Sequence, residues 1–478
     1  MMMTFETIIG LEIHVQILTQ SKAFCSDANQ YTKTPNQNIG VISLAHPGAL
    51  PKMNVSHLEK AILLSLALES NINTISYFDR KNYYYPDLPK GYQITQDNAP
   101  YCTGGSVNFM SEGEKKSIRL HHIHIEEDAG KSIHDMNDDY SYVDYNRAGV
   151  PLLEIVTEPD FRSGQEVSDF LAELQKIVQY LNISDGNMEE GSFRCDCNVS
   201  VRNVGQPLGE RCEIKNMNSR KFAKNAIEYE ANRQISIIEN GGIISRSTML
   251  YDPIKNETRP MRKKEAVNDY RYFPDPDLPP VVINDDVITK VKNQLVALPF
   301  QRYIRLTEDF HLSHADAEFL IDDIKYIELF LGLATHFDAY KDLADLLINK
   351  AIPWLKAENL DVWHDPKPIL QFIDLLQNGK VSKSAAYQHI FPEWIEDIRQ
   401  DPLQIAMNKQ LVISENQDFL DDEIKKILAS YPDKVKEYQK GKKGLIGFFM
   451  GQVIQKTGGK TDPKILQAKM EKALLSGL

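Results

Sequence analysis

The sequence predicts an α+β protein whose first part mixes strands and helices and whose remainder is helical. Alternating apolar and polar residues, the period of a half-buried strand, recur near 7–17, 117–127, 151–157, 193–202 and 211–216. The gaps between these segments are irregular and hold no regular strand–helix repeat, which favours α+β over a doubly wound sheet. From about residue 295 the apolar pattern becomes helical and prolines interrupt it.

The chain length predicts roughly three domains, at about 150 residues for each. We expect a mixed domain over 1–293, a helical domain over 294–406 and a small helical tail domain over 407–478 of the 478 residues. Within the first domain, amphipathic helices are predicted at 55–69 and 164–181. The second begins with a capping box, because Ser163 precedes Glu166 by three residues.

The proline-rich segment 272–280 is expected to be extended, because residues before proline avoid the helical region. We interpret this segment as the exit from the first domain.

The charge of the chain restricts where RNA could bind. There are 54 basic and 67 acidic residues, a net charge of −13, which argues against RNA contact over the whole surface. Residues 431–478, however, carry ten lysines against four acidic residues, a net charge of +6. This tail is a candidate RNA contact, and a solvated lysine-rich helix surface is the alternative.

The sequence indicates a cytoplasmic protein with no membrane segment. Its five cysteines have no disulfide-framework spacing. The first sixteen residues include Glu6 and Glu12 and no basic stretch, so no secretory signal is predicted. The longest apolar run, 61–68, is far shorter than the roughly 20 residues that a membrane span needs.

Acidic side chains gather on the polar faces of the predicted strands. In the first strand Glu12, His14 and Gln16 share one face, because side chains alternate along a strand. The same alternation places four more charged residues on polar strand faces, namely Arg194, Asp196, Glu213 and Lys215; Glu154 shares a face with apolar neighbours, and Glu127 lies at a strand end.

A half-buried strand with its polar side in water explains any one of these faces. If the strands are neighbours, however, the carboxylates would crowd together, and like charges at such density need a cation. Oxygen-rich ligand sets suit Mg²⁺, which commonly holds a nucleotide phosphate as well. The sequence therefore predicts a carboxylate-lined Mg²⁺–ATP site, provided that the strands meet.

Two other kinds of site are not favoured. Cys195 and Cys197, with Cys212, are separated by too few residues for a usual zinc pair, so we expect them to be buried as small hydrophobic side chains. The chain has no P-loop and no Rossmann glycine fingerprint. Any ATP chemistry must therefore use another fold.

Eight motifs, in order along the chain, resemble the B subunit of the tRNA-dependent amidotransferase family. They begin at Ile9 (IGLEIHVQ), His46 (HPGALP), Phe78 (FDRKNYYYPDLPKGYQ), Glu126 (EEDAGK), Asp144 (DYNRAGVPLLEIV), Met188 (MEEGSFRCD), Glu213 (EIKNMNS) and Asp269 (DYRYFPDPD). The similarity covers almost the whole chain, including its lysine-rich tail.

The resemblance implies a cradle domain with a glutamine synthetase-like mixed sheet, then a helical domain and a tail domain that engages tRNA. It implies a carbon–nitrogen ligase that phosphorylates the side-chain carboxylate of Glu on tRNA(Gln), of Asp on tRNA(Asn), or of both, with ATP. Ammonia then displaces the phosphate. In the implied heterotrimer, an amidase-type glutaminase would supply the ammonia through a channel, and a small third protein would clamp the two larger ones together.

Combined with the strand faces, the resemblance implies roles for individual residues. We expect the catalytic Mg²⁺ shell to be Glu12, His14, Glu127, Glu154 and Glu213. Asp196, Arg194 and Lys215 are expected at the nucleotide, and Lys81, Tyr84 and Lys90 at the border of the substrate or channel.

The chain departs from the family pattern at one place. Many relatives carry paired cysteines near Cys25 and His46, whereas Ser26 and Ala45 stand beside these residues here. We therefore predict no zinc site.

Two other functions remain open from the sequence. One is a non-catalytic tRNA-binding adaptor whose acidic strands are structural. The other is a free-standing glutamine synthetase-like ligase that acts on a small carboxylate without tRNA.

Overall fold

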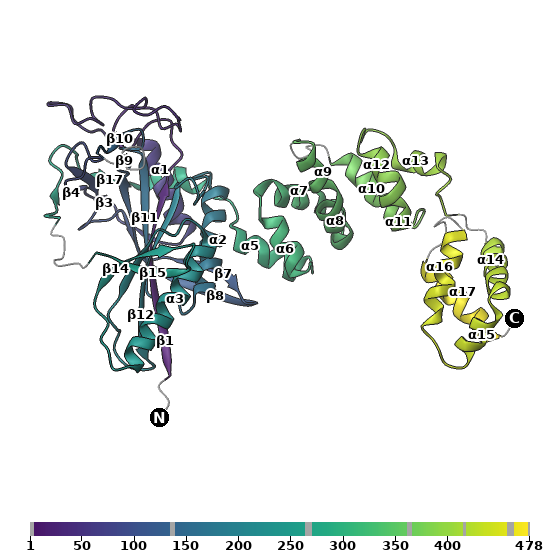
Figure 1. The fold of residues 1–478 in the computed structure, drawn as a ribbon. Coiled ribbons are helices and arrows are strands. Elements are labelled where there is room, and N and C mark those ends of the chain that lie inside the picture. The colour runs from purple at the N-terminus through teal and green to yellow at the C-terminus, as the bar shows by residue number, and fades with distance from the viewer. Residues whose placement is uncertain are drawn as a thin grey trace. The chain divides into compact units, whose positions relative to one another are not determined.

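The computed structural model describes residues 4–133, 139–262, 270–360, 366–413, 417–456 and 463–476. The chain divides into two compact units, Met1–Arg305 and Leu306–Leu478. The first unit holds the strands and five helices of the described chain, and the second is helical (Figure 1). The predicted mixed sheet followed by a helical region is therefore confirmed. The predicted boundaries at 293 and 406 stay predictions.

A large mixed sheet forms the centre of the first unit. Across the sheet, its strands within the described residues are β15 (Glu257–Arg262), β14 (Ser247–Asp252), β13 (Cys212–Lys215), β12 (Phe193–Asn203), β1 (Phe5–Gln16), β11 (Pro151–Thr157), β8 (Glu114–Glu127), β6 (Cys102–Thr103) and β2 (Asn71–Ile72), with β7 (Ser106–Ser111) paired to β8. The β13–β14 pair is parallel, and the other pairs are antiparallel. The five strand segments predicted from the alternating pattern correspond to β1, β8, β11, β12 and β13.

Register fixes which side chains share a face of this sheet. In β1 the apolar residues Ile9, Leu11, Ile13 and Val15 belong to the main core, so their polar neighbours face the other way. One residue, His121, bulges out of the ladder, since β8 pairs His122 with Val156 but Leu120 with Thr157. The pairing between β8, β11 and β1 is regular on the C-terminal side of this bulge.

Helices cover the apolar face of the sheet (Figure 1). They are α1 (Val55–Ala67), α2 (Gly164–Tyr180) and α3 (Arg220–Glu239), and α4 (Asp285–Lys292) packs on α1. Half of the predicted capping box of α2 is present, because Ser163 Oγ accepts the Glu166 amide at 3.1 Å, whereas the Glu166 carboxylate accepts the amide of Arg162, the residue before the cap, at 2.7 Å. Cys195 and Cys197 lie buried in this core, as predicted.

Small sheets complete the first unit beside the C-terminal end of β8. They are β16 (Phe273–Pro274), β4 (Asp79–Asn82) and β5 (Tyr92–Thr95) in one sheet, β17 (Val281–Val282) with β3 (Ile75–Ser76), and β9 (Lys131–Ile133) with β10 (Tyr142–Asp144). Thr95 donates a hydrogen bond to Glu126 at 3.0 Å, and Ile94 N donates one to Glu127 at 3.0 Å. The three-stranded sheet is thus attached to the last residues of β8.

The proline-rich segment is extended at Phe273–Pro274, as predicted, but it turns at 276–278 and does not leave the first unit. Phe273 and Pro274 pair with Arg80 and Asp79 of β4, and the Arg80 guanidinium binds Asp275 at 2.8 Å. The interpretation of this segment as an exit is therefore wrong, because its backbone and carboxylates have partners in β4.

The second unit consists of short helices. Its α-helices in the described chain are α6 (His314–Ile321), α7 (Ile324–Ala334), α8 (Tyr340–Leu346), α9 (Ile352–Ala357), α10 (Lys367–Gln377), α11 (Lys383–Ala385), α12 (Phe391–Trp394), α13 (Pro402–Asn408), α14 (Gln417–Ser430), α15 (Pro432–Gln439), α16 (Leu445–Lys456) and α17 (Pro463–Ser476). Single π-helical turns lie at Arg305–Asp309, Leu347–Ala351 and Ala386–Ile390. Helix α6 starts after the cap Ser313, whose hydroxyl accepts the Asp316 amide at 3.1 Å.

The last four helices share a hydrophobic core of their own. Ile424 of α14, Tyr438 of α15, Phe449 of α16 and Met470 of α17 are buried in it. Within the described residues, no helix has the length and apolar character needed to cross a bilayer.

Helix α2 contains a buried carboxyl group, Glu173, that caps α5 (Pro299–Ile304) by accepting the Phe300 amide at 2.8 Å. Burial raises the pKa of Glu173 to about 7. Because the unfolded pKa is about 4.3, the folded state binds the extra proton between these values. The stabilisation is complete below about pH 4.5 and is lost as the pH rises to about 7.

We expect Glu173→Gln to remove this pH dependence while keeping an acceptor for Phe300. The wild type should lose up to about 3 kcal/mol relative to the variant between pH 5 and pH 8. The measurement is the free energy of unfolding of both proteins in urea at each pH, followed by far-UV circular dichroism. If the free energy of unfolding depends on pH in the same way for both proteins, the raised pKa of Glu173 is contradicted.

Candidate active site

The centre of the large sheet brings the predicted polar faces together. In the strand register Glu12 is opposite Asp196, His14 is opposite both Glu154 and Arg194, and Asn198 is opposite Glu213. Directly paired residues on neighbouring strands place their side chains on the same face. Residues far apart in the sequence therefore form one polar surface, opposite the face that carries α1, α2 and α3.

The innermost cluster of this surface is the triad His14, Glu126 and Glu154, whose ligand atoms all lie within 4.8 Å of one another. His14 Nε2 is 3.2 Å from Glu154 Oε2 and 3.7 Å from Glu126 Oε1. His124 approaches the same two carboxylates from β8, at 3.3 Å and 3.7 Å. Two carboxylates are thus held between two imidazoles.

These contacts shift the proton affinities of the triad strongly. Burial by itself would raise the pKa of Glu154, but His124 and His14 hold it well below its usual range. Burial would lower the pKa of His124, yet Glu154 and Glu126 raise it to about 10. The carboxylates are therefore ionised, and cationic imidazoles neutralise them in the absence of another cation.

The neighbouring residues Glu126 and Glu127 point to opposite faces of the sheet. Glu126 joins the triad, whereas Glu127 forms a buried ion pair with Lys90 and accepts the Ile94 amide. The sequence alone favours Glu127 for the Mg²⁺ shell. The structure instead brings Glu126 beside His14 and Glu154, because His124 and Glu126 have the same parity along β8.

A second cluster surrounds Glu12. Asn198 Nδ2 donates to Glu12 Oε1 at 3.0 Å, and Lys215 Nζ bridges Asp196 at 2.8 Å and Glu213 at 3.0 Å. Burial and the nearby carboxylates, Glu154 first among them, raise the pKa of Glu12. The predicted residues Glu12, Asp196, Glu213 and Lys215 do therefore lie together.

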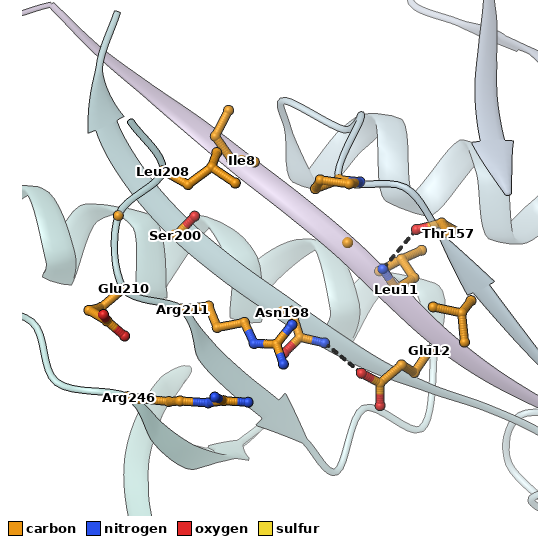
Figure 2. A pocket seen from close by; sticks show the side chains of 14 residues that line it. Ile8, Leu11, Glu12, Thr157, Asn198, Ser200, Leu208, Glu210, Arg211 and Arg246 are labelled. Atoms are coloured by element: carbon orange, nitrogen blue, oxygen red, sulfur yellow. Dashed lines mark hydrogen bonds between the residues drawn. The ribbon is translucent and has the colours of Figure 1, made fainter. Parts of the chain in front are cut away.

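Two adjoining hollows open beside Glu12, a larger one of about 330 Å³ (Figure 2) and a smaller one of about 130 Å³. Apolar side chains including Ile8, Leu11 and Leu208 line the larger one, whereas the smaller is lined by polar groups. Arg211 and Arg246 line both hollows. Neither guanidinium forms an ion pair with any residue that the structure describes, so both are available to an anion.

The remaining predicted residues take different positions. Arg194 lies on the polar face but binds Asp128 at 3.0 Å. Lys81 has its ammonium 5.3 Å from the Tyr270 ring, and the carboxylates Glu126 and Glu154 raise its pKa although burial opposes them. Tyr84 is 90% exposed on the β4–β5 connection. Lys81 and Arg194 are thus both coupled electrostatically to the triad, since the charge of Arg194 acts on His14.

The histidines of β8 form a chain that leads from the triad toward the surface. His124 Nδ1 is 3.1 Å from His122 Nε2, and His122 Nδ1 is 2.7 Å from Nδ1 of the exposed His121. Burial, together with the other two imidazoles, lowers the pKa of His122 to about 4. His122 therefore stays neutral at physiological pH and can both donate and accept a hydrogen bond.

Cys25 lies apart from the polar face and has protein partners. Its Sγ is 3.5 Å from Ser43 Oγ, which donates to Asp27 at 2.5 Å. His46 is exposed.

The triad fits a divalent cation. Two ionised carboxylates and one imidazole, held in place by strand pairing and by Thr95, match the oxygen-rich ligand sets of Mg²⁺ and Mn²⁺. The raised proton affinities of His14 and His124 have the same origin, since surplus negative charge attracts protons when no metal is bound.

Fold and site together define a class of protein, one with a mixed sheet whose polar face carries a cluster of candidate metal ligands and two arginines beside a hollow. The GatB/GatE catalytic domain model matches residues 7–289, and the GatB domain model matches residues 328–474. The chain belongs to the GatB family, the B subunits of the tRNA-dependent amidotransferases.

Relatives in the family are similar over nearly their whole length. A protein of Anaeromyxobacter sp. (strain Fw109-5) is 42% identical over 98% of this chain and 99% of its own. One of Thermodesulfovibrio yellowstonii (strain ATCC 51303 / DSM 11347 / YP87) is 40% identical over 99% of this chain and 100% of its own. Both are named as the B subunit of aspartyl/glutamyl-tRNA(Asn/Gln) amidotransferase.

Sequence reasoning missed Glu126, His124 and Arg246. The alternation along β8 could have selected Glu126, because it shares a face with His122 and His124 while Glu127 shares one with the apolar Ile123 and Ile125. Arg246 immediately precedes β14, outside any strand pattern, and reaches the hollow only because β14 lies beside β13. No periodic signal marks it.

We expect Glu126→Gln to weaken divalent-cation binding at least tenfold, because it removes one anionic ligand of the triad. Glu127→Gln is the matched control, since it changes the adjacent carboxylate and keeps an acceptor for Lys90 and Ile94. Binding of Mn²⁺ measured by electron paramagnetic resonance tests both variants. Loss in the Glu127 variant alone would restore the assignment made from the sequence and exclude the triad.

Proposed function

We propose that this chain is the ATP-using, tRNA-handling subunit of a transamidase. It converts Glu-tRNA(Gln) to Gln-tRNA(Gln), Asp-tRNA(Asn) to Asn-tRNA(Asn), or both. The observation that carries the proposal is family membership along both matched regions. The triad and the two arginines, which form no ion pair with a described residue, support it, because phosphoryl transfer needs a cation and a phosphate site.

The chemistry follows from the poor reactivity of a carboxylate. Its leaving group would be oxide, so the side-chain oxygen first attacks the γ-phosphorus of ATP and ADP departs. Ammonia then adds to the acyl phosphate, the C–O bond to phosphate breaks, and the proton lost by nitrogen leaves with phosphate or solvent. The products are the amide and inorganic phosphate.

The described contacts suggest how the residues share this work. His14, Glu126 and Glu154 would hold Mg²⁺, which supplies charge neutralisation for the transferring phosphoryl group. Arg211, Arg246 and Lys215 are suited to the phosphates, and the apolar wall of the larger hollow to the nucleoside. Glu12 and Glu213 lie between these two groups. Their carboxylates can help to position the metal–nucleotide complex.

The finer features of the enzyme are inferred from the family resemblance. We infer a cradle with a glutamine synthetase-like sheet, and a heterotrimer in which an amidase-type glutaminase is the source of ammonia and a small third protein clamps the assembly. Lys81, Tyr84 and Lys90 would border the substrate or channel. A cytoplasmic location is compatible with five free thiols.

Positional isotope transfer tests the acyl phosphate. We expect the reconstituted complex, given ATP, ammonium chloride and Glu-tRNA(Gln) or Asp-tRNA(Asn) with ¹⁸O in the side-chain carboxylate, to transfer ¹⁸O into phosphate. Glu12→Gln should reduce this transfer about a hundredfold, since Glu12 faces the proposed phosphate site, while tRNA still binds.

The same assay separates the alternatives. If ¹⁸O transfer persists when Glu12 and the triad residues of this chain are substituted, the result favours a non-catalytic adaptor. Amide formed from free glutamate, ammonia and ATP without tRNA favours a free-standing ligase.

The lysine-rich tail is the candidate for RNA contact that the charge distribution indicates. Lys440, Lys442 and Lys443 are exposed around the connection between α15 and α16. Truncation at residue 431 would remove three of the four helices that share the tail core, so point substitutions are the sharper test.

We expect Lys440→Gln/Lys442→Gln/Lys443→Gln to weaken tRNA binding and to reduce its logarithmic salt slope by about 2, because each lost phosphate contact removes roughly 0.7–0.9. Affinity measured at several salt concentrations gives the slope. Lys33→Gln/Lys255→Gln/Lys292→Gln removes the same charge from exposed positions of the first unit. Equal slopes for the two triple variants would contradict a specific tail contact.

A further inference from the structure

Four tyrosines form a continuous row of rings beside β4. Tyr85, Tyr83, Tyr270 and Tyr272 follow one another with ring centroids 6.4, 6.1 and 6.0 Å apart, each pair in an edge-to-face arrangement. Tyr85 at the outer end is 63% exposed, while Tyr83, Tyr270 and Tyr272 are partly exposed. A hydrophobic core would cover such rings, whereas this row keeps part of each ring accessible.

The row is held in place from behind by polar contacts. Asn82 Nδ2 donates to the carbonyl oxygens of Tyr270 and Arg271 at 3.1 and 2.8 Å, and the Asn82 amide donates to Tyr270 O at 3.0 Å. The following strand β16 pairs with β4. The two segments that carry the rings, 83–85 and 270–272, are therefore fixed relative to each other.

Lys81 connects the row electrostatically with the triad. Lys81 Nζ lies 5.3 Å from the Tyr270 ring, and its ammonium makes no ion pair with a described residue. The charge of Glu126 acts on Lys81, Tyr83 and Tyr272 alike. Lys81 thus lies beside the row of rings and within the electrostatic influence of the triad carboxylates.

We propose that this tyrosine row is the stacking platform for the unpaired 3′ end of the aminoacylated RNA, with Lys81 near its last phosphate or ester. The inference rests on the proposed function. That function requires an amino acid esterified to the end of a single strand to reach the carboxylates. Aromatic faces and a cation recognise single-stranded RNA without reading its sequence, which suits an enzyme whose relatives are named for two different tRNAs.

The flexible 3′ end is the part of tRNA that this surface fits. A duplex is recognised through its backbone and groove and offers no open base faces, whereas unpaired bases can stack on the rings. The overall net charge of −13 also favours a local contact of this kind over a broad electrostatic one.

Kinetics of the reconstituted complex, with ammonium chloride as nitrogen donor, test the platform. Tyr85→Ala and Tyr270→Ala should each raise KM for the misacylated tRNA roughly tenfold, with a smaller change in kcat, because stacking contributes to binding. Tyr85→Phe and Tyr270→Phe keep the ring and should restore most of the loss. Tyr229→Ala, in α3 behind the sheet, is the control.

An RNA whose penultimate unpaired nucleotide is abasic gives a second readout. The wild type should bind this RNA about tenfold more weakly than the intact RNA, because the stacking partner is absent. The difference in affinity between the wild type and the alanine variants should therefore be smaller for this RNA. Circular dichroism checks that each variant is folded.

The platform would be overturned by an unchanged KM in folded alanine variants. It would also be overturned if the phenylalanine variants had a KM as high as that of the alanine variants. The proposed function would stand in that case, provided that the wild-type complex still forms the amide. A wild-type complex that forms no amide from misacylated tRNA would instead overturn the function itself.

Discussion

The site depends on the regular pairing of three strands, β8, β11 and β1. This pairing places Glu126 and Glu154 next to each other in the interior, where two carboxylates repel and resist burial. His14 and His124, delivered by the same register from either side, supply the compensating charge. The strand order, the helices on the apolar face and the small sheet that carries Thr95 all preserve this register.

Much of the fold could be predicted from the sequence because its signals are local. Alternation marked β1 and β12, and Ser163 marked the start of α2. The proline-rich segment 272–280 was predicted to be extended, but its partner could not be foreseen. The ion pair between Arg80 and Asp275 spans almost two hundred residues of sequence, and composition contains no information about it.

The candidate site was predictable in kind and only partly in detail. Strand parity places Glu12, His14 and Gln16 together without knowledge of any neighbour. The choice between Glu126 and Glu127 depends on whether the alternation seen at His124 continues to the end of β8. The acidic run 126–128 gives no apolar residue that would mark this alternation. The position of Arg246 at the hollow results from the parallel pairing of β13 with β14, and neither segment reveals this pairing by itself.

The bulge at His121 bears on how this protein can vary between species. An inserted residue between His124 and Glu126 would exchange the sheet faces of Glu126 and Glu127, and would so separate Glu126 from His14 and Glu154 and Glu127 from Lys90. A length change on the other side of His121 would meet a ladder that is already irregular. We infer that insertions and deletions in the β7–β8 hairpin are confined to the part before His121, and that β8 keeps a fixed length from His122 to Glu127.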